Sequence, residues 1–293
     1  MKPSHSEFIT VRGLRYHIRH WGRKDAPKLF MTHGWMDVSA SFQFVVDCLQ
    51  HDWHVIAPDW RGFGLTRNIP GIDAYWFPDY FGDLDAILRH YSPDMPVNLI
   101  GHSMGGNVVC LYAGVRPQRV AKLINLEGFG LPAVQAGQAP GRYAKWLNEL
   151  REPPRLRTYA TQEDVAARLQ KNNPRLTDEQ AAFLSGHWAA RNDRGEWEIL
   201  ADPAHKLSNP QLYHVEEVLA CWNAIVAPVL WVEADDTDAW RWMGSKSEAR
   251  AETDRRIQHI PHVTTAIIRD AGHMLHHDQP EALAQLIEGF LQG

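Results

Sequence analysis

The chain has 293 residues, of which 44% are hydrophobic and 22% are charged, and its formal net charge is −5. This composition is typical of a globular protein with a large core and argues against a disordered chain. Acidic and basic residues are mixed along the chain, so neither a basic nucleic-acid surface nor a membrane anchor is expected. No apolar run reaches ~18 residues, and residues 1–10 lack the apolar segment of a secretory signal.

The three cysteines are far apart in the sequence, at Cys48, Cys110 and Cys221. Their spacing fits neither a disulfide framework nor a metal cluster. We therefore expect buried free thiols in a cytoplasmic protein. The sequence leaves the oligomeric state undetermined, and a homo-oligomer is compatible with it.

The predicted elements alternate between strands and helices over residues 1–128. Residues 7–21 form two strands broken at Gly13, and short apolar strands follow at 28–32, 54–58, 97–100 and 121–126. Helical patterns lie between them at 39–50, 79–91 and 105–115. Most of these strands are apolar throughout, which is typical of parallel strands covered by helices on both faces. We predict an α/β fold with right-handed crossovers.

The alternation stops between about Gly128 and Pro228, where the chain is polar, helix-prone and rich in proline. It resumes with strands at 228–232 and 264–268 and a helix at 280–292. We expect residues 129–227 to form a mainly helical cap over the carboxyl edge of the sheet, where α/β proteins bind ligands. Residues 1–128 and 228–293 then form the core.

The stretch LIGHSMGGN at 99–107 contains the pattern G-x-S-x-G, centred on Ser103. It follows a predicted strand and precedes a predicted helix, which is the context that this motif requires. Gly101 and Gly105 allow a tight turn, and the helix N-terminus favours developing negative charge. Ser103 is therefore predicted to be a nucleophile.

Two loops supply the predicted partners of Ser103. We expect the backbone N–H groups of Trp35 and Met104 to form an oxyanion hole, with His33 orienting the loop that carries Trp35. Among the 16 histidines, His273 is the best candidate for the general base, because it follows the last strand and so comes after the serine in the chain.

The other histidines near His273 have a simpler interpretation. His276 and His277 are expected to be surface or packing residues. Together with His273 and Asp278 they resemble a metal site in composition, but their loop spacing and Pro280 argue against one. No metal and no cofactor are expected.

Four sequence blocks resemble the α/β-hydrolase superfamily, in the order of that family: HGWMDVSASF, APDWRGFGLT, LIGHSMGGNVV and AGHMLHHDQPE. HGWMD…SF, EGFGLP and EWEILADPAHKLSNP are most similar to its serine-hydrolase-like esterase branch. The resemblance covers essentially the whole chain. It implies a mostly parallel eight-stranded sheet flanked by helices, a helical cap after the sixth strand, and ester hydrolysis without a cofactor.

The resemblance leaves two positions for the acid that supports His273. The usual pattern after the seventh strand, strand-G-x-x-D, would place an aspartate at Thr237, and Asp235, Asp236 and Asp238 are its neighbours. Glu127, 24 residues after Ser103 at the tip of the sixth strand, matches the position used by haloalkane dehalogenases and some small esterases. We favour Glu127, with Asp235 or Asp236 as the alternative and Asp238 behind them. The alternative, non-catalytic interpretation of Glu127 is that its carboxylate only caps the end of the strand.

The predicted function is that of a carboxylesterase acting on a small-molecule ester with small to medium hydrophobic groups. Thioesterase, lactonase and carbon–carbon bond hydrolase activities use the same triad, and a slow or non-catalytic ligand receptor is the competing class. Dehalogenases and epoxide hydrolases are disfavoured because they need an aspartate nucleophile. The aromatic side chains expected to build the pocket, together with His33, are Trp35, Trp60, Phe63, Phe129, Trp146 and Trp188. Arg61 and Arg142 are interpreted as surface arginines rather than anion ligands.

Overall fold

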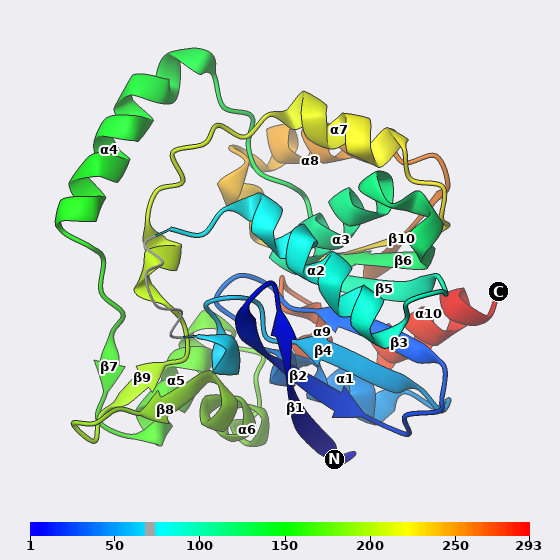
Figure 1. The fold of residues 1–293 in the computed structure, drawn as a ribbon, viewed down its shortest axis with the longest axis horizontal. Coiled ribbons are helices and arrows are strands. Elements are labelled where there is room, and N and C mark those ends of the chain that lie inside the picture. Colours follow the sequence, from blue (N-terminus) through cyan, green and yellow to red (C-terminus); the bar gives the residue numbers. More distant parts are fainter. Residues whose placement is uncertain (68–73) are drawn as a thin grey trace.

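The computed structural model describes residues 1–67 and 74–293. Among them, eight strands form one sheet in the order β1-β2-β4-β3-β5-β6-β10-β11 (Figure 1). The β1–β2 and β2–β4 pairings are antiparallel and all the others are parallel, which confirms the predicted mostly parallel sheet. The strands are β1 (Ser4–Val11), β2 (Leu14–Trp21), β3 (Lys28–Thr32), β4 (His54–Pro58), β5 (Val97–His102), β6 (Val120–Leu126), β10 (Val229–Ala234) and β11 (Val263–Ile268).

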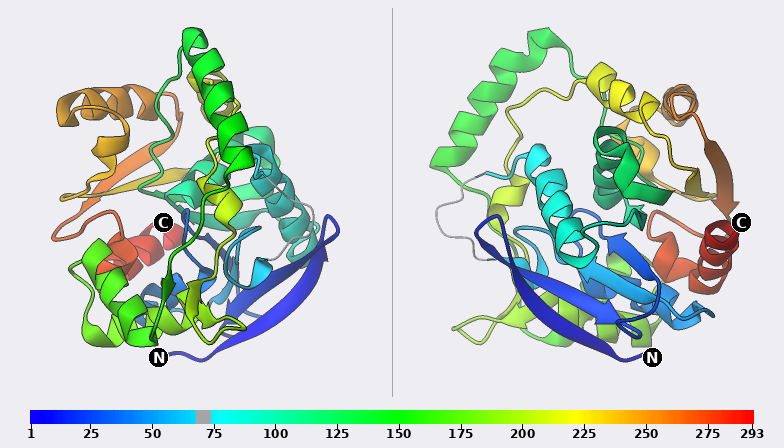
Figure 2. Two further views of the ribbon diagram at one scale, coloured as in Figure 1. Left: turned by 90° about the vertical axis from the view of Figure 1, so that its left-hand side faces the viewer. Right: turned by 45° about the vertical axis from the view of Figure 1, so that its right-hand side comes forward.

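Helices cover both faces of this sheet (Figures 1 and 2). One face carries α1 (Gln43–Cys48), α9 (Leu275–Asp278) and α10 (Pro280–Gln292), and the other carries α2 (Phe77–Tyr91), α3 (Met104–Val115), α7 (Val215–Asn223) and α8 (Lys246–Ile257). Short 3₁₀ turns link the elements at Ser39–Phe42, Gly64–Thr66, Pro117–Arg119, Ala136–Gln138, Pro203–Lys206 and Ala239–Trp242. Successive strand residues enter opposite cores: Leu29 and Met31 join the α1–α10 side, whereas Phe30 joins the α2–α3 side. This two-sided burial explains why the strands are apolar throughout.

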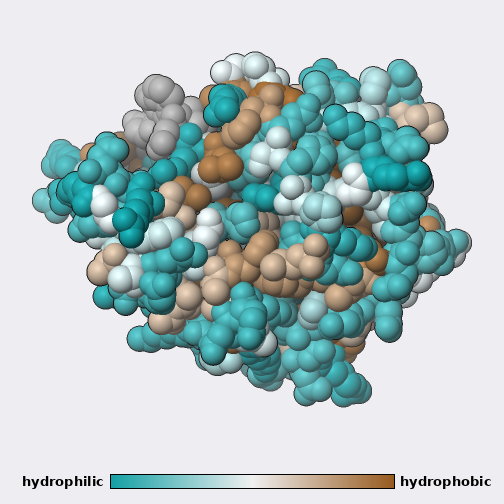
Figure 3. Space-filling view, turned by 90° about the horizontal axis from the view of Figure 1, so that it is seen from below, coloured by the Kyte–Doolittle hydropathy of each residue, from teal (hydrophilic) through white to brown (hydrophobic). Residues whose placement is uncertain are grey.

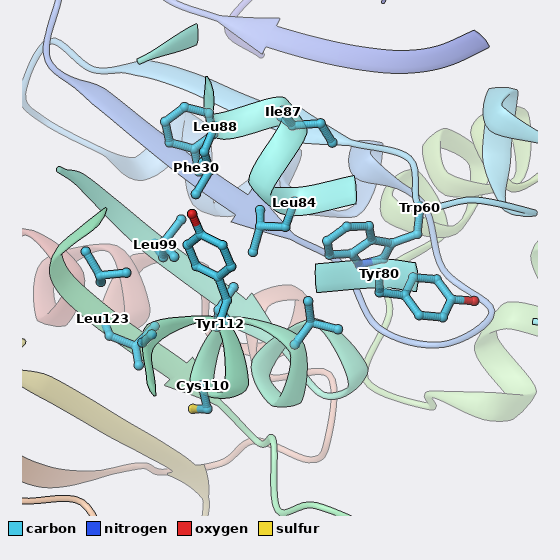
Figure 4. Packing of buried hydrophobic residues seen from close by; sticks show 14 of the residues in the cluster. Phe30, Trp60, Tyr80, Leu84, Ile87, Leu88, Leu99, Cys110, Tyr112 and Leu123 are labelled. Atoms are coloured by element: carbon cyan, nitrogen blue, oxygen red, sulfur yellow. The ribbon is translucent and has the colours of Figure 1, made fainter. Parts of the chain in front are cut away.

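The α2–α3 side of the core is shown at close range in Figure 4. Leu84 and Leu88 of α2 are fully buried, as are Leu99 of β5 and Tyr112 of α3. Burying each large apolar side chain contributes about 1.5–3 kcal/mol. This packing fixes the position of α3, whose first turn carries the serine motif.

The segment predicted to form the cap holds α4 (Ala139–Arg151), α5 (Gln162–Asn172) and α6 (Asp178–Trp188). It also holds a three-stranded sheet, β7-β9-β8 (Thr158–Tyr159, Trp197–Ile199 and Ala189–Arg191), which was not predicted because strands of two or three residues are too short to show an alternating pattern. In Figures 1 and 2 α4 stands away from the core helices, and none of its residues is buried. Helix α7 lies within the predicted cap segment but packs against α3.

The surface agrees with the composition of the chain. The face drawn in Figure 3 is mainly hydrophilic, and apolar side chains gather near its middle. In the parts of the chain that the structure covers, no helix has both the length and the apolar character needed to cross a membrane. The three cysteines are free, as predicted; Cys110 is buried, whereas Cys48 and Cys221 are half-buried.

Asp59, which follows β4, connects strand β2 with two of the 3₁₀ segments of the fold. Its carboxylate accepts hydrogen bonds from the Ser39 N–H at 2.7 Å, the Leu65 N–H at 2.9 Å and His17 Nδ1 at 2.7 Å. Burial by itself would raise the pKa of the Asp59 carboxyl. The hydrogen bonds from His17 and the Leu65 N–H outweigh that effect and hold its pKa well below the usual range.

We expect Asp59→Asn to lower the free energy of unfolding by about 2–4 kcal/mol, because three donors lose a buried charged acceptor. A folded-state pKa below the unfolded value of ~3.9 means that the carboxylate stabilises the fold above that pH. This stabilisation is lost as the pH falls toward the folded-state pKa. Urea unfolding should therefore show that the variant loses less stability than the wild type between about pH 5 and about pH 3. Equal losses in the two proteins would contradict this assignment.

Candidate active site

Ser103 occupies a strained turn between β5 and α3. Its φ angle is +51°, a region that residues with a side chain rarely adopt. The Ser103 N–H donates to the Leu126 carbonyl at 2.8 Å, which holds the turn against β6. A Cβ atom at Gly101 would collide with the backbone of Gly105, and one at Gly105 would collide with the Thr32 carbonyl. The two glycines are therefore required for close packing, as the sequence predicted.

Three side chains from distant parts of the chain form a hydrogen-bonded series at the carboxyl edge of the sheet. Ser103 Oγ lies 3.0 Å from His273 Nε2, and His273 Nδ1 lies 3.1 Å from Glu127 Oε2. They follow β5, β11 and β6, respectively. Parallel strands bring these ends together because their carboxyl ends share one edge. Such a series can take a proton from a serine hydroxyl and stabilise the resulting imidazolium.

The Glu127 carboxylate is held from three directions. It is 1% exposed, and its Oε1 accepts from the Ala234 N–H at 2.7 Å, while Oε2 accepts from the Thr237 hydroxyl as well as from His273. Burial raises the pKa of Glu127, and the hydrogen bonds from His273, Thr237 and Ala234 oppose that effect. Thr237 is the position where the common pattern would place the aspartate, and here its hydroxyl supports the glutamate.

The three neighbouring aspartates are exposed and engaged elsewhere. Asp235 accepts from the Ala271 N–H at 3.3 Å. Asp236 pairs with Arg175 at 2.5 Å, and Asp238 pairs with Arg241 at 3.3 Å. The geometry therefore favours Glu127 over each of them as the partner of His273.

The two predicted oxyanion donors are near Ser103: Met104 follows it directly in the chain, and Trp35 lines the same two cavities as Ser103. Met104 is the first residue of α3, so its N–H has no acceptor within the helix. Trp35 lies in the loop after β3, and its N–H, like that of Met104, donates to no acceptor among the described residues. Both N–H groups are therefore available to an oxygen placed next to Ser103.

His33 and Trp60 do not belong to the pocket, which corrects the sequence expectation. Both are fully buried, and neither lines a cavity at Ser103. His33 donates from Nδ1 to the Gly34 carbonyl at 2.7 Å and accepts from the Trp60 N–H at 2.9 Å, so it orients the loop before Trp35. Burial lowers the pKa of His33 to about 4, which keeps the ring neutral. Phe63 packs edge-to-face on His33 and is buried as well.

Two cavities meet at Ser103 and Trp35, which line both of them. The first has a volume of about 390 Å³ and an aromatic lining of Tyr75, Trp76, Phe77, Phe129 and Trp146. The second has a volume of about 510 Å³ and an apolar lining that includes Leu156, Leu169, Leu184, Trp188 and Ile199. Phe129 and Trp146 line the first cavity and Trp188 lines the second, and their contact with a substrate stays a prediction. The volumes of both cavities are those of sites for small molecules.

The two arginines considered as anion ligands lie elsewhere. Arg61 is buried rather than on the surface, and it forms two hydrogen bonds of 2.6 Å with Asp83. Arg142 donates to the Asn209 carbonyl at 2.8 Å, which links α4 to the rest of the cap segment. Arg61 therefore forms a structural ion pair with Asp83, and its guanidinium is not available to a ligand.

His102 is a site residue that the sequence reasoning missed. Its Nε2 donates to the His273 carbonyl at 2.8 Å and so holds the backbone of the predicted base. It occupies the first variable position of the G-x-S-x-G motif, but only the fold shows that this position faces the loop after β11. His276 and His277 are buried behind it, so they are packing residues and not surface residues.

The loop histidines do not converge on a metal site with Asp278. That carboxylate accepts from the Gly272 N–H at 2.8 Å and from Asn173 at 2.7 Å. A different set of buried side chains has ligand atoms within 4.8 Å of one another: Asp37, His102 and His276. Among the residues that the structure describes, this set has the composition and spacing that could hold a metal ion. The expectation that the protein uses no metal stays a prediction.

Comparison with known proteins agrees with this architecture. Residues 27–280 match the family described as the alpha/beta hydrolase fold, and the chain belongs to that family. A serine hydrolase-like protein from Danio rerio is 26% identical over 282 residues, covering 93% of this chain and 83% of that protein. An AB hydrolase superfamily protein from Bacillus subtilis is 24% identical and covers 98% of this chain and 97% of its own length.

Two solved structures share the fold. A thioesterase domain from the curacin biosynthetic pathway superimposes with a TM-score of 0.85 at 21% identity, covering 98% of this chain and 99% of that one. An esterase from Mycobacterium tuberculosis has a TM-score of 0.73 at 20% identity, with 100% and 92% covered. The protein is thus a hydrolase of the α/β fold that resembles serine hydrolases.

Proposed function

We propose that the protein is a carboxylesterase that hydrolyses small to medium hydrophobic esters through an acyl-enzyme on Ser103. The observation that carries this proposal is the hydrogen-bonded series of Ser103, His273 and Glu127, because it opens into two largely apolar cavities. An apolar lining favours hydrophobic acyl and alcohol groups. The activity needs no cofactor, and we expect the enzyme to act in the cytoplasm.

The first half of the reaction forms the acyl-enzyme. His273 takes the Ser103 proton on Nε2 while Oγ attacks the ester carbonyl carbon. The Trp35 and Met104 N–H groups donate to the carbonyl oxygen as it becomes negative, and Glu127 stabilises the imidazolium. The tetrahedral intermediate then breaks its bond to the alcohol oxygen, which leaves with the proton from His273.

The second half releases the acid. A water molecule gives a proton to His273 and attacks the acyl carbon, and the Ser103–acyl bond breaks as the serine regains its proton. The same steps would cleave a thioester, a lactone or an activated carbon–carbon bond. Thioester hydrolysis is the main alternative, because one of the similar structures is named as a thioesterase domain and another as an esterase.

A panel of p-nitrophenyl esters and matched thioesters of increasing acyl length tests this proposal. We expect saturable hydrolysis of the oxygen esters, and a fluorophosphonate probe should add its mass to the peptide that contains Ser103. Prior labelling should abolish hydrolysis. If the folded protein neither reacts with the probe nor turns over any ester, the receptor interpretation replaces the esterase, and a preference for thioesters would make it a thioesterase.

A further inference from the structure

The two cavities that meet at Ser103 differ in charge. No lysine or arginine among the described residues lines the first cavity, and its only carboxylate is Glu127, which is fully hydrogen-bonded. The second cavity is lined by Arg157, Arg168 and Lys206. The site therefore presents unlike surroundings to the two halves of an ester.

The three cations of the second cavity all come from the cap segment and are exposed to solvent. Within the described ranges, none has a carboxylate within 4.0 Å, whereas other arginines of the cap segment do, such as Arg175 with Asp236. The Arg157 guanidinium lies 5.6 Å from the Tyr159 ring centroid, and Tyr159 lines the same cavity. Arg157 is thus held against the cavity wall while its charge remains unpaired.

The inner end of the second cavity has the opposite character. Asp37 lines it and is only 6% exposed, with its carboxylate bonded to the Ser41 hydroxyl. Burial raises the pKa of Asp37 to about 7, so near neutral pH this end of the cavity carries a partial negative charge, which disfavours a second one. No lysine or arginine among the described residues lies beside Asp37 in this lining, in contrast to the rim with Arg157, Arg168 and Lys206. An anion in this cavity is therefore stabilised at the cationic rim and not at its base.

We propose that the second cavity binds the half of the substrate that ends in an anionic group, a carboxylate or a phosphate. This inference rests on the proposed esterase function and specifies its substrate class. An apolar chain connects the ester at Ser103 to the anion, which Arg157, Arg168 and Lys206 bind at the rim. The uncharged half occupies the aromatic first cavity. Cations at the mouth of a cleft also raise the association rate of an anionic substrate.

Paired substrates test the proposal. In the first series, the anion is on the acyl half: mono-p-nitrophenyl esters of straight-chain dicarboxylic acids are compared with p-nitrophenyl esters of monocarboxylic acids of equal length. In the second series, the anion is a phosphate on the alcohol half, compared with the uncharged alcohol. We expect kcat/KM to be higher for the charged member of a pair at one or more chain lengths, by about tenfold.

The double variant Arg157→Gln/Arg168→Gln should remove this preference. We expect it to raise KM for the charged ester by about tenfold with kcat nearly unchanged, and to leave the uncharged ester within about twofold. Lys171→Gln is the matched control, because Lys171 is an exposed cation on the same helix as Arg168 but lines neither cavity. It should change neither substrate.

Product binding gives a readout that does not need turnover. Calorimetry should show that a straight-chain dicarboxylate binds the wild type more tightly than the monocarboxylate of equal length, and that the double variant loses this difference. The proposal is overturned if charged and uncharged members behave alike in both series and in calorimetry, or if the double variant weakens both equally. Failure of the esterase function is distinct, because it would abolish hydrolysis of the uncharged esters as well.

Discussion

Ser103→Ala is expected to reduce kcat for p-nitrophenyl acetate by about 10⁶-fold, and the remaining acceleration over the unassisted reaction, about 10³–10⁴-fold, comes from the oxyanion hole and substrate binding. The reason is geometric: Ser103 carries the one hydroxyl, among the described residues, that lines both cavities, and its Oγ lies 3.0 Å from His273 Nε2. Steady-state hydrolysis at neutral pH measures the loss.

Two controls make this result specific. His273→Ala should cost about as much as Ser103→Ala, and the double variant should cost no more than either alone, because the residues act as one unit. Ser247→Ala, at an exposed position on α8, should be as active as the wild type. Full activity in Ser103→Ala would rule out the acyl-enzyme mechanism.

Glu127→Gln is expected to reduce kcat by about 10³–10⁴-fold. The amide preserves the shape of the side chain but removes the negative charge that stabilises the imidazolium, and its NH₂ group competes with the His273 Nδ1–H. Asp235→Asn and Asp236→Asn should stay within about twofold of the wild type, because both carboxylates are exposed and engaged away from His273. If an aspartate variant loses turnover and Glu127→Gln does not, the glutamate only caps its strand.

Thr237 provides a sharper form of this experiment. Its hydroxyl donates to the Glu127 oxygen that faces His273, so an aspartate at this position would bring a carboxylate near the same imidazole nitrogen. We expect Glu127→Gln/Thr237→Asp to recover at least about tenfold of the activity that Glu127→Gln loses. Glu127→Gln/Asp236→Glu, which alters a carboxylate already paired with Arg175, should recover none.

Local patterns were sufficient for the parts of the fold that depend on neighbouring residues. The apolar strands, the helices at 79–91 and 105–115 and the turn at Ser103 were predictable because burial on two faces, helical periodicity and glycine at a tight turn all leave a signature within a few residues. The structure confirms these elements as β3 to β6, α2 and α3. The small β7-β9-β8 sheet left no such signature, since its strands are two or three residues long.

Burial of individual polar and aromatic side chains could not be predicted in the same way. Arg61 was expected on the surface, and His33 and Trp60 were expected at the pocket, yet all three are buried. Each is satisfied by a partner from another segment or from its own loop, such as Asp83 for Arg61. A buried polar group is stable only with such partners, and these are set by long-range packing.

The sequence by itself determined the α/β class and the serine on its turn, because both follow from patterns within a few residues. The order of serine before histidine can be read directly along the chain. Only the tertiary structure decided which carboxylate faces His273. The strand order places β6 beside β10, so Glu127 at the tip of β6 meets Ala234, the last residue of β10, and Thr237 in the loop that follows, and its carboxylate faces the loop after β11. Glu127 and the aspartates after β10 are both candidates to bind His273 Nδ1, because they follow neighbouring strands. Which of them reaches this nitrogen depends on the strand order, and the spacing of residues along the chain does not reveal that order.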